Sequence, residues 1–207
     1  MKRKTIAALA LALTGAAGCA SMMMEHSDRS AEALAMMKAS FQAHGQARLD
    51  RLDQDDVQRT CSRYNVDDPV PRDLAERIEK EQLALIKYPQ GSLMGDWKAG
   101  EHIAQTGVGM QYSDDPTKPA GGNCYACHQL TKAEVSYGTI GPPLYQFAKQ
   151  RGFTPEMQKY AYGKIYNSEA FSACSSMPRF GHKGILTEQQ IKDVVALLMD
   201  PESPVNK

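Results

Sequence analysis

Apolar residues recur three or four positions apart along much of the chain, which is the spacing of an amphipathic helix. The stretch between Thr187 and Pro201 shows the pattern most clearly, because a Thr-x-x-Gln sequence that can cap a helix opens it. The pattern is helical almost throughout, so the fold is predicted to be all-α. The apolar face of this last helix consists of Ile191, Val194, Val195 and Leu198.

Prolines, glycines and capping residues delimit most of the other predicted helices. A helix over 71–87 is expected to carry Leu74, Ile78 and Leu85 on one apolar face. The remaining helices are predicted over 27–52, from residue 55 through Cys61, over 96–106 and from Thr154 through Ile165.

Good helix formers, namely Ala, Leu, Met, Lys and Gln, dominate residues 27–52 and predict one helix there. Met36 and Met37 lie beside Leu34 and Phe41 at helical spacing. We expect these methionines to pack against other apolar side chains rather than to bind a metal, since flexible thioethers commonly fill gaps in a core.

The first 18 residues have the pattern of an export signal. A basic start at 2–4 precedes an apolar stretch at 6–13 that is too short to span a membrane. The Ala-Ala-Gly-Cys sequence that ends at Cys19 resembles a lipoprotein signal, in which the cysteine is acylated and becomes the new N-terminus. Ordinary cleavage nearby, for instance after Ala20, is the alternative. Both predict a periplasmic protein, and the first also anchors it to a membrane through Cys19.

The composition changes after the glycine-containing segment 91–95, where we place a domain boundary. The predicted organisation is therefore a signal peptide over 1–18, an N-terminal helical extension over 19–94 and a second domain over 95–207.

One short stretch carries recognisable chemistry, a Cys-x-x-Cys-His run at 124–128 that follows Gly-Gly-Asn. Two thiols three residues apart on one helical turn can each form a thioether with a haem vinyl group, and the next residue directs an imidazole at the iron. The run predicts one covalently bound haem c, with Cys124 and Cys127 as the attachment residues and His128 as an axial ligand of the iron.

Two other uses of a Cys-x-x-Cys pair fit the sequence less well. A thioredoxin-like pair would follow a strand in a βαβ unit, whereas a segment rich in glycine and proline precedes this one. A structural zinc site needs a second pair of ligands at a similar spacing, and none follows. The export signal favours haem, because haem is attached to thiols on the outer side of the inner membrane.

The composition gives no support for nucleic-acid binding and agrees with a bound apolar cofactor. Lys and Arg balance Asp and Glu at 24 each, so no strong positive field predicts nucleic-acid binding. A content of 42% hydrophobic and 7% aromatic residues makes a lean core for 207 residues, and an apolar macrocycle would add to it. No nucleophile paired with a base is recognisable, so no catalytic residue is assigned.

The five cysteines divide into three groups. Two are assigned to haem and Cys19 lies in the export signal, which leaves Cys61 and Cys174. An even remainder in an oxidising compartment predicts a disulfide between these two, and a pair of unbonded buried thiols is the alternative. The bond would hold the chain three residues before Met177.

Met177 is the predicted second axial ligand of the haem iron. It lies 49 residues after His128, on a loop before the terminal helix, and Pro178 restricts the local backbone. A thioether ligand raises the reduction potential of haem iron. The alternative ligands are Met110, His102 and His182.

Two neighbours of the expected ligands are also assigned roles. A carbonyl in the Pro142-Pro143 segment is expected to accept a hydrogen bond from the second ring nitrogen of His128, which would fix the tautomer of the ring. Arg179 either pairs with a haem propionate or is a solvated surface arginine.

These motifs together resemble SoxX, the small cytochrome c subunit of the SoxAX complex of bacterial thiosulfate oxidation. The resemblance covers about residues 95–204. It implies a class I cytochrome c-like domain, with His128 and Met177 as axial ligands. The segments that carry it are 123–128, Tyr-Gly-Thr-Ile-Gly-Pro-Pro-Leu at 137–144, Met-Pro-Arg-Phe-Gly at 177–181 with Cys174 before it, and 184–201.

The resemblance also implies partners and an activity. A SoxA-type haem subunit would hold the catalytic haem and join thiosulfate oxidatively to a cysteine of the SoxYZ carrier protein, so that the complex is an L-cysteine S-thiosulfotransferase. The present chain would accept the electrons and pass them to a soluble cytochrome c. The resemblance does not include residues 22–90, so it assigns no role to the extension.

Two other functions remain open at this point. The chain could be a free-standing periplasmic or lipid-anchored cytochrome c that shuttles electrons without an enzyme partner. It could also be a haem sensor or a peroxidase, if the sixth position of the iron is open.

Overall fold

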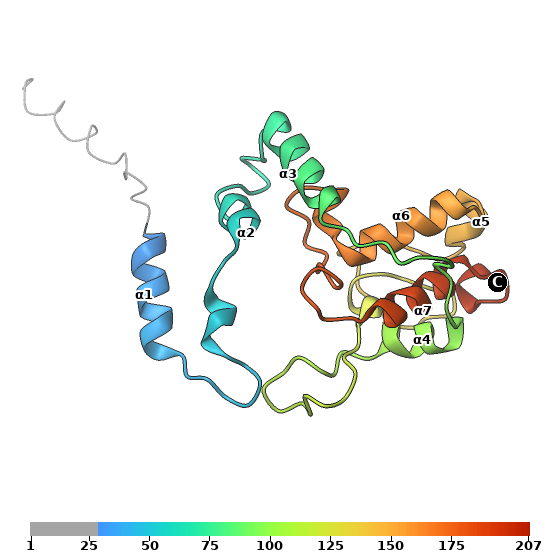
Figure 1. Ribbon diagram of the computed structural model, residues 1–207, viewed down its shortest axis with the longest axis horizontal. Helices are drawn as coiled ribbons and strands as arrows, with labels where there is room; N and C mark the ends of the chain where they lie inside the picture. Colours follow the sequence, from blue (N-terminus) through green and yellow to red (C-terminus); the bar gives the residue numbers. More distant parts are fainter. Residues whose placement is uncertain (1–28) are drawn as a thin grey trace, which may run out of the picture. The chain divides into compact units, whose positions relative to one another are not determined.

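The computed structural model describes residues 29–207, and its regular elements are helices (Figure 1). An isolated antiparallel bridge between His44 and Ala47 is the only β pairing in that part of the chain. The prediction of an all-α fold is confirmed. Within residues 29–207 no helix combines the length and the apolar character needed to cross a membrane. The signal peptide over 1–18 and the proposed lipidation of Cys19 lie outside the described residues.

The chain divides into two compact units, with the boundary in the sequence between Phe41 and Gln42. The first unit contains α1 (Ser30–Ser40), and none of the side chains of this helix is buried. Met36 and Met37 are both exposed, so the expectation that they pack against other apolar residues was wrong.

The helix predicted over 27–52 ends at Ser40, where Phe41 takes up an extended conformation. The second unit begins instead with a turn around Gly45, whose φ of +53° favours glycine. A Cβ atom at this glycine would lie 2.1 Å from the carbonyl oxygen of Tyr112. A tertiary contact therefore overrides the helix propensity of residues 42–48.

The second unit contains the remaining helices, and several of their starts are capped as the sequence predicts. Asp55 and Thr187 each form a capping box, and Thr154 accepts a hydrogen bond from the backbone of Met157. In chain order the elements are η1 (Leu49–Leu52), α2 (Asp56–Cys61), α3 (Arg72–Ala84), α4 (Trp97–Gln105), η2 (Cys124–Ala126), α5 (Phe147–Arg151), α6 (Pro155–Tyr166), η3 (Ser168–Ala170), α7 (Glu188–Met199) and η4 (Pro204–Asn206), where η denotes a 3₁₀ helix.

Two details of the helix prediction differ from the structure. Helix α3 ends at Ala84, and Leu85 is exposed rather than part of a buried face, although Ile78 is buried as expected. The short helix α5 was not predicted, because five residues are too few for a recognisable period.

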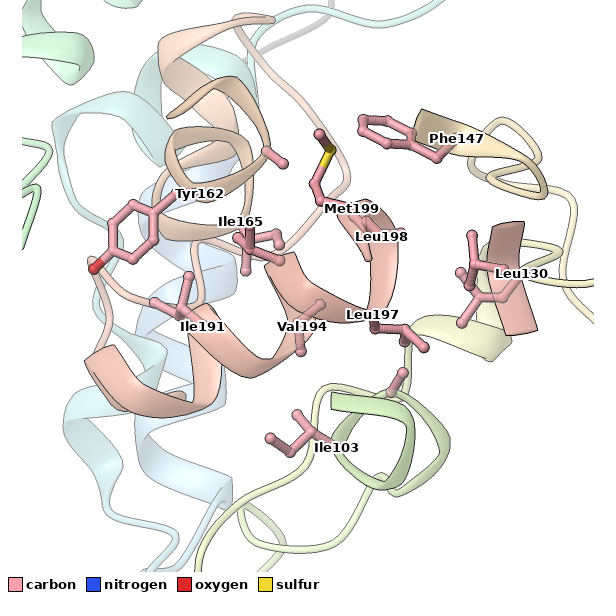
Figure 2. Packing of buried hydrophobic residues seen from close by; sticks show 14 of the residues in the cluster. Ile103, Leu130, Phe147, Tyr162, Ile165, Ile191, Val194, Leu197, Leu198 and Met199 are labelled. Carbon is pink, nitrogen blue, oxygen red and sulfur yellow. The ribbon is translucent and has the colours of Figure 1, made fainter. Parts of the chain in front are cut away.

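Helix α7 forms the centre of the core. Figure 2 shows Val194 and Leu197 of α7 between Ile165 of α6 and Ile103 of α4. Burying each such aliphatic side chain stabilises the fold by about 1.5–3 kcal/mol. The predicted apolar face of this helix is therefore confirmed as the main contact surface of the domain.

The contact between α4 and α7 depends on glycine. A Cβ atom at Gly100 of α4 would lie 2.1 Å from the carbonyl oxygen of Asp193, so only glycine lets the two helices approach this closely. The carboxylate of Asp193 then accepts hydrogen bonds from the backbone N–H of Asp96 (2.9 Å) and from Gln189 (2.8 Å). The backbone N–H of Gly95 also donates to the carbonyl of Lys192 (3.0 Å).

Helices α2 and α3 belong to the same compact unit as the C-terminal helices. Helix α3 packs on η3, where Asn167 donates to both the backbone carbonyl and the side-chain oxygen of Gln82 (3.2 and 3.0 Å). Both of these residues are buried. The sequence-based boundary between residues 94 and 95 stays a prediction.

Replacing Gly100→Ala tests the α4–α7 contact. By helix propensity alone, alanine should raise the free energy of unfolding by about 1 kcal/mol. The clash with Asp193 outweighs this gain, so we expect the free energy of unfolding to fall by about 1–3 kcal/mol. Urea denaturation followed by circular dichroism measures the change. The exposed Lys98→Ala on the same helix is the matched control and should leave the midpoint nearly unchanged. A G100A protein as stable as the parent would contradict the packing described.

Candidate haem site

A cavity of about 710 Å³ is lined by residues of α4, α5, α6 and α7 and by the loops between them. Its volume lies in the range of roughly 300–1,000 Å³ that is usual for cofactor pockets. The four side chains predicted to hold haem, Cys124, Cys127, His128 and Met177, all line it. Most of the wall between them is apolar, and its larger side chains include Leu130, Leu144, Phe147, Ile165, Leu197 and Leu198.

The Cys-x-x-Cys-His run begins with the 3₁₀ turn η2, which ends at Ala126 and has Cys127 as its C-cap. Asn123 precedes it with a φ of +46°, and its backbone N–H donates to the carbonyl of Thr106 at the end of α4 (2.9 Å). A Cβ atom at Gly121 would lie 1.9 Å from that same carbonyl oxygen. Gly121 therefore lets the chain pass close to the end of α4, and the left-handed backbone of Asn123 turns it into η2.

The two thiols of this turn are not joined to each other, and both face the cavity. Burial raises the pKa of the Cys124 thiol to about 12, so its sulfur favours a form without charge. The sulfur of a thioether carries no charge, so a thioether bond to haem suits this buried position. Within residues 29–207 no group of three or more His, Cys, Asp or Glu side chains is placed to hold a metal ion.

The His128 ring is oriented from one side by the segment that follows it. Its Nδ1 lies 2.7 Å from the carbonyl oxygen of Pro142, which confirms the expected acceptor. A carbonyl can only accept, so Nδ1 donates and Nε2 keeps the lone pair that an iron ion needs. A Cβ atom at Gly141 would lie 2.2 Å from Cε1 of the ring, so the ring occupies space that only glycine leaves free.

Hydrogen bonds join this segment to the Cys-x-x-Cys turn along its length. The backbone N–H of Gly138 donates to Tyr125 (2.9 Å), and that of Gly141 donates to Cys127 (2.8 Å). The backbone N–H of Leu144 donates to Gln129 (2.7 Å). The segment 137–144 and the run 124–128 therefore form one unit around the imidazole.

Met177 reaches the same cavity from the loop between η3 and α7. The hydroxyl of Ser168 donates to its carbonyl oxygen (2.5 Å), and its own N–H donates to the hydroxyl of Ser175 (3.2 Å). The alternative ligands His102, Met110 and His182 are not among the residues that line the cavity.

Arg179 is not a solvated surface arginine, and it is not among the residues that line the cavity. Its side chain is 6% exposed, and it donates to the carboxylate of Asp55 at the start of α2 (2.5 Å). Because this partner lies 124 residues away in the sequence, no local pattern could predict the pair.

Two cationic side chains that sequence reasoning missed, Arg151 and Lys164, line the cavity. Burial lowers the pKa of the Lys164 ammonium, and the carboxylates of Glu169 and Glu79 act in the opposite direction. An anionic group in the cavity, such as a haem propionate, would stabilise the charged lysine. Neither residue stands out in the sequence, since both lie on helices among other charged positions.

Cys61 and Cys174 form a disulfide whose Cα atoms are 5.2 Å apart. The bond joins the end of α2 to the loop that carries Met177. These are the two cysteines that the sequence leaves for a disulfide once the other three are assigned to haem attachment and to the export signal.

The residues of the cavity fit a haem c. The cavity has the required size and apolar walls, two free thiols three residues apart face it, and the imidazole ring is held with one nitrogen available. Cys124 and Cys127 would hold the macrocycle, and His128 and Met177 would be the residues that bind its iron.

Comparison with known proteins gives one family match, which agrees with this chemistry, and one similar protein. Residues 118–200 match the cytochrome c family. The chain is also 42% identical, over 158 residues, to a protein of Aquifex aeolicus described as an uncharacterized lipoprotein. The match covers 74% of this chain and 73% of the Aquifex protein.

Replacing Gly141→Ala tests the support of the His128 ring. The added methyl group overlaps the imidazole, so the ring should shift away from its hydrogen bond with Pro142, and a larger share of the ferric haem should become high-spin. The visible and paramagnetic resonance spectra measure this share. Thr139→Ala, at an exposed position of the same segment, is the control and should keep the parent spectrum. Identical spectra for G141A and the parent would show that this glycine does not position the ring.

Proposed function

We propose that this chain is the electron-transfer subunit of a periplasmic thiosulfate-oxidising complex of the SoxAX type. The premise is that residues 118–200 form a cytochrome c domain, which carries covalently bound haem c. The prediction of an all-α class I cytochrome c-like fold is confirmed. Bound haem supplies one-electron oxidation and reduction.

The observation that carries the electron-transfer role is that an imidazole and a thioether line the same cavity as the two attachment cysteines. In our proposal Cys124 and Cys127 would anchor the macrocycle, and His128 and Met177 would both bind its iron. An iron bound by both residues would have no place left for a substrate. This favours electron transfer over the sensor or peroxidase alternative.

The carbonyl of Pro142 makes His128 a stronger ligand, because it holds Nδ1 as a donor and raises the basicity of Nε2. The thioether of Met177 favours ferrous iron and raises the reduction potential. The chain would therefore accept electrons readily and pass them to a soluble cytochrome c of higher potential.

The proposed complex rests on the SoxX-like motifs around the haem residues and on the surface beside them. Ile140 lines the cavity and is 76% exposed, and Val135 and Tyr137, a few residues before it in the chain, are exposed as well. Apolar side chains grouped beside a redox site favour a protein partner. A SoxA-type haem subunit, which would hold the catalytic haem, is the partner that the motifs suggest.

The stoichiometry of the reaction agrees with a one-electron carrier. A carrier thiol and thiosulfate combine to a cysteine S-thiosulfonate, one proton and two electrons. The sulfur–sulfur bond forms as the thiol S–H bond breaks, and both electrons leave the sulfur atoms. The chain would therefore be reduced and reoxidised twice for each cysteine of SoxYZ that is modified.

The Aquifex relative supports a second candidate, a lipid-anchored cytochrome c that shuttles electrons without an enzyme partner. That relative is described as a lipoprotein, and the Ala-Ala-Gly-Cys sequence before Ala20 fits the same kind of processing. We propose Cys19 as the acylated residue. Acylation is compatible with both candidates, so it does not decide between them.

Replacing Met177→Ala tests the axial pair. The ferric protein should lose the Met–iron charge-transfer absorption band, its reduction potential should fall by a fraction of the roughly 0.8 V range that axial ligands span, and the reduced protein should bind carbon monoxide. Met110→Ala, which removes an exposed methionine, is the matched control and should behave like the parent. A parent protein that lacks the band, or an M177A protein that keeps it, would contradict the assignment.

Co-purification from the native host tests the partner. A tagged full-length chain, extracted with mild detergent, should bring down a second haem-staining chain, and the isolated pair should reduce added cytochrome c when given thiosulfate and SoxYZ. Cys19→Ser separates anchoring from partnership, because it should release the chain from the membrane fraction and leave the pair intact. Recovery of the haem protein alone, in amounts that match its expression, would favour the free shuttle.

A further inference from the structure

The loop that carries Met177 is held by the N-terminal part of the same compact unit on both sides of this residue. The cysteine three positions before Met177 and the arginine two positions after it are both bound to residues at the ends of α2. Helix α2 lies outside residues 118–200, which match the cytochrome c family. The family match therefore assigns no role to these bonds.

On the first side, Cys61 at the end of α2 bonds to Cys174. Cys174 has a φ of +60°, a conformation that costs a residue with a side chain free energy. The carboxylate of Glu169 accepts a hydrogen bond from its N–H (2.6 Å), and that of Glu79 in α3 accepts one from the N–H of Ala173 (3.0 Å). The backbone before Met177 is thus fixed in one conformation.

On the second side, Asp55 precedes α2, and its two carboxylate oxygens accept hydrogen bonds from different partners. Oδ1 accepts a hydrogen bond from the backbone N–H of Gln58 and caps the helix (2.9 Å). Oδ2 accepts hydrogen bonds from Arg179 (2.5 Å) and from Lys183 (2.7 Å). Since the Arg179 side chain is almost fully buried, this ion pair is poorly screened by water.

A single short element therefore contacts the loop at two points. Helix α2 has six residues, and with a rise of about 1.5 Å per residue it is roughly 9 Å long. A helix this short is rigid along its axis but unstable alone, so its caps and its bonds to the loop maintain it. Held at residues 174 and 179, the loop cannot move Met177 away from the cavity without breaking one of these bonds or displacing α2.

We propose that Asp55 and Cys61, at the two ends of α2, form a brace that positions Met177 on the haem iron and suppresses opening of its loop. The proposal rests on the axial role of Met177 proposed above. Neither residue is among those that line the cavity, so both would act only through the loop. They are positioning residues.

The brace acts on an equilibrium between a closed loop, with Met177 on the iron, and an open loop that leaves the iron free to bind another ligand. A ligand that competes with Met177 binds only to the open form, so its apparent affinity is proportional to the fraction of protein that is open. Loss of either end of the brace should raise that fraction.

Imidazole titration of the full-length ferric holoprotein measures the open fraction. Asp55→Asn keeps a capping side chain and removes the charge, and Cys61→Ala with Cys174→Ala removes the disulfide. Each change should raise the apparent imidazole affinity by about tenfold, a factor equivalent to about 1.4 kcal/mol. Lys183→Gln, which leaves the Arg179 pair in place, should have a smaller effect than D55N.

The control is Glu76→Gln, which removes a carboxylate from the exposed pair that Arg72 and Glu76 form on α3 (2.8 Å). It should leave the imidazole affinity unchanged. Thermal unfolding is recorded for every variant, because a brace that served stability alone would lower the melting temperature and leave the imidazole affinity of the folded protein as it was. That outcome in both D55N and the disulfide variant would overturn the proposal.

The same titration distinguishes failure of the brace from failure of the axial role of Met177. If Met177 is not a ligand, M177A and the parent bind imidazole with equal affinity and the parent lacks the Met–iron band. If Met177 is a ligand but the brace is absent, M177A binds imidazole more tightly than the parent, and D55N and the disulfide variant bind it as the parent does.

Discussion

Because Gly100 carries no side chain, α4 approaches the backbone of α7 closely, and residues of both helices line the haem cavity. The end of α4 receives the hydrogen bond from Asn123 that leads the chain into the Cys-x-x-Cys turn. Helix α7 supplies Val194 and Leu197 to the same cavity. The contact between α4 and α7 therefore places the attachment cysteines near the apolar side chains of α7.

The two expected iron ligands are supported in different ways. His128 is held locally, by a carbonyl fourteen residues further along the chain and by a glycine that leaves room for the ring. Met177 lies on a loop that long-range bonds hold in place, including a disulfide that spans 113 residues. We infer that the imidazole side of the site is nearly self-contained, whereas the thioether side depends on the N-terminal part of the compact unit.

The haem turn could be predicted in detail because its chemistry is local. Three side chains within five residues, and a proline carbonyl close by, specify attachment and orientation through covalent geometry and short-range hydrogen bonds. Helices with capping boxes, such as α7, were predictable for the same reason. The prediction failed for residues 42–48, where contact with the loop around Tyr112 overrides a favourable helix composition.

By itself the sequence determined the all-helical pattern, the haem-binding turn and the choice of Cys61 and Cys174 as the remaining cysteines, since each follows from periodicity, spacing or counting. Only the tertiary structure decided that Arg179 pairs with Asp55 and that Arg151 and Lys164 face the cavity. The physical reason is distance along the chain: charged side chains have many available partners in a sequence, and packing of the core brings one of them within reach.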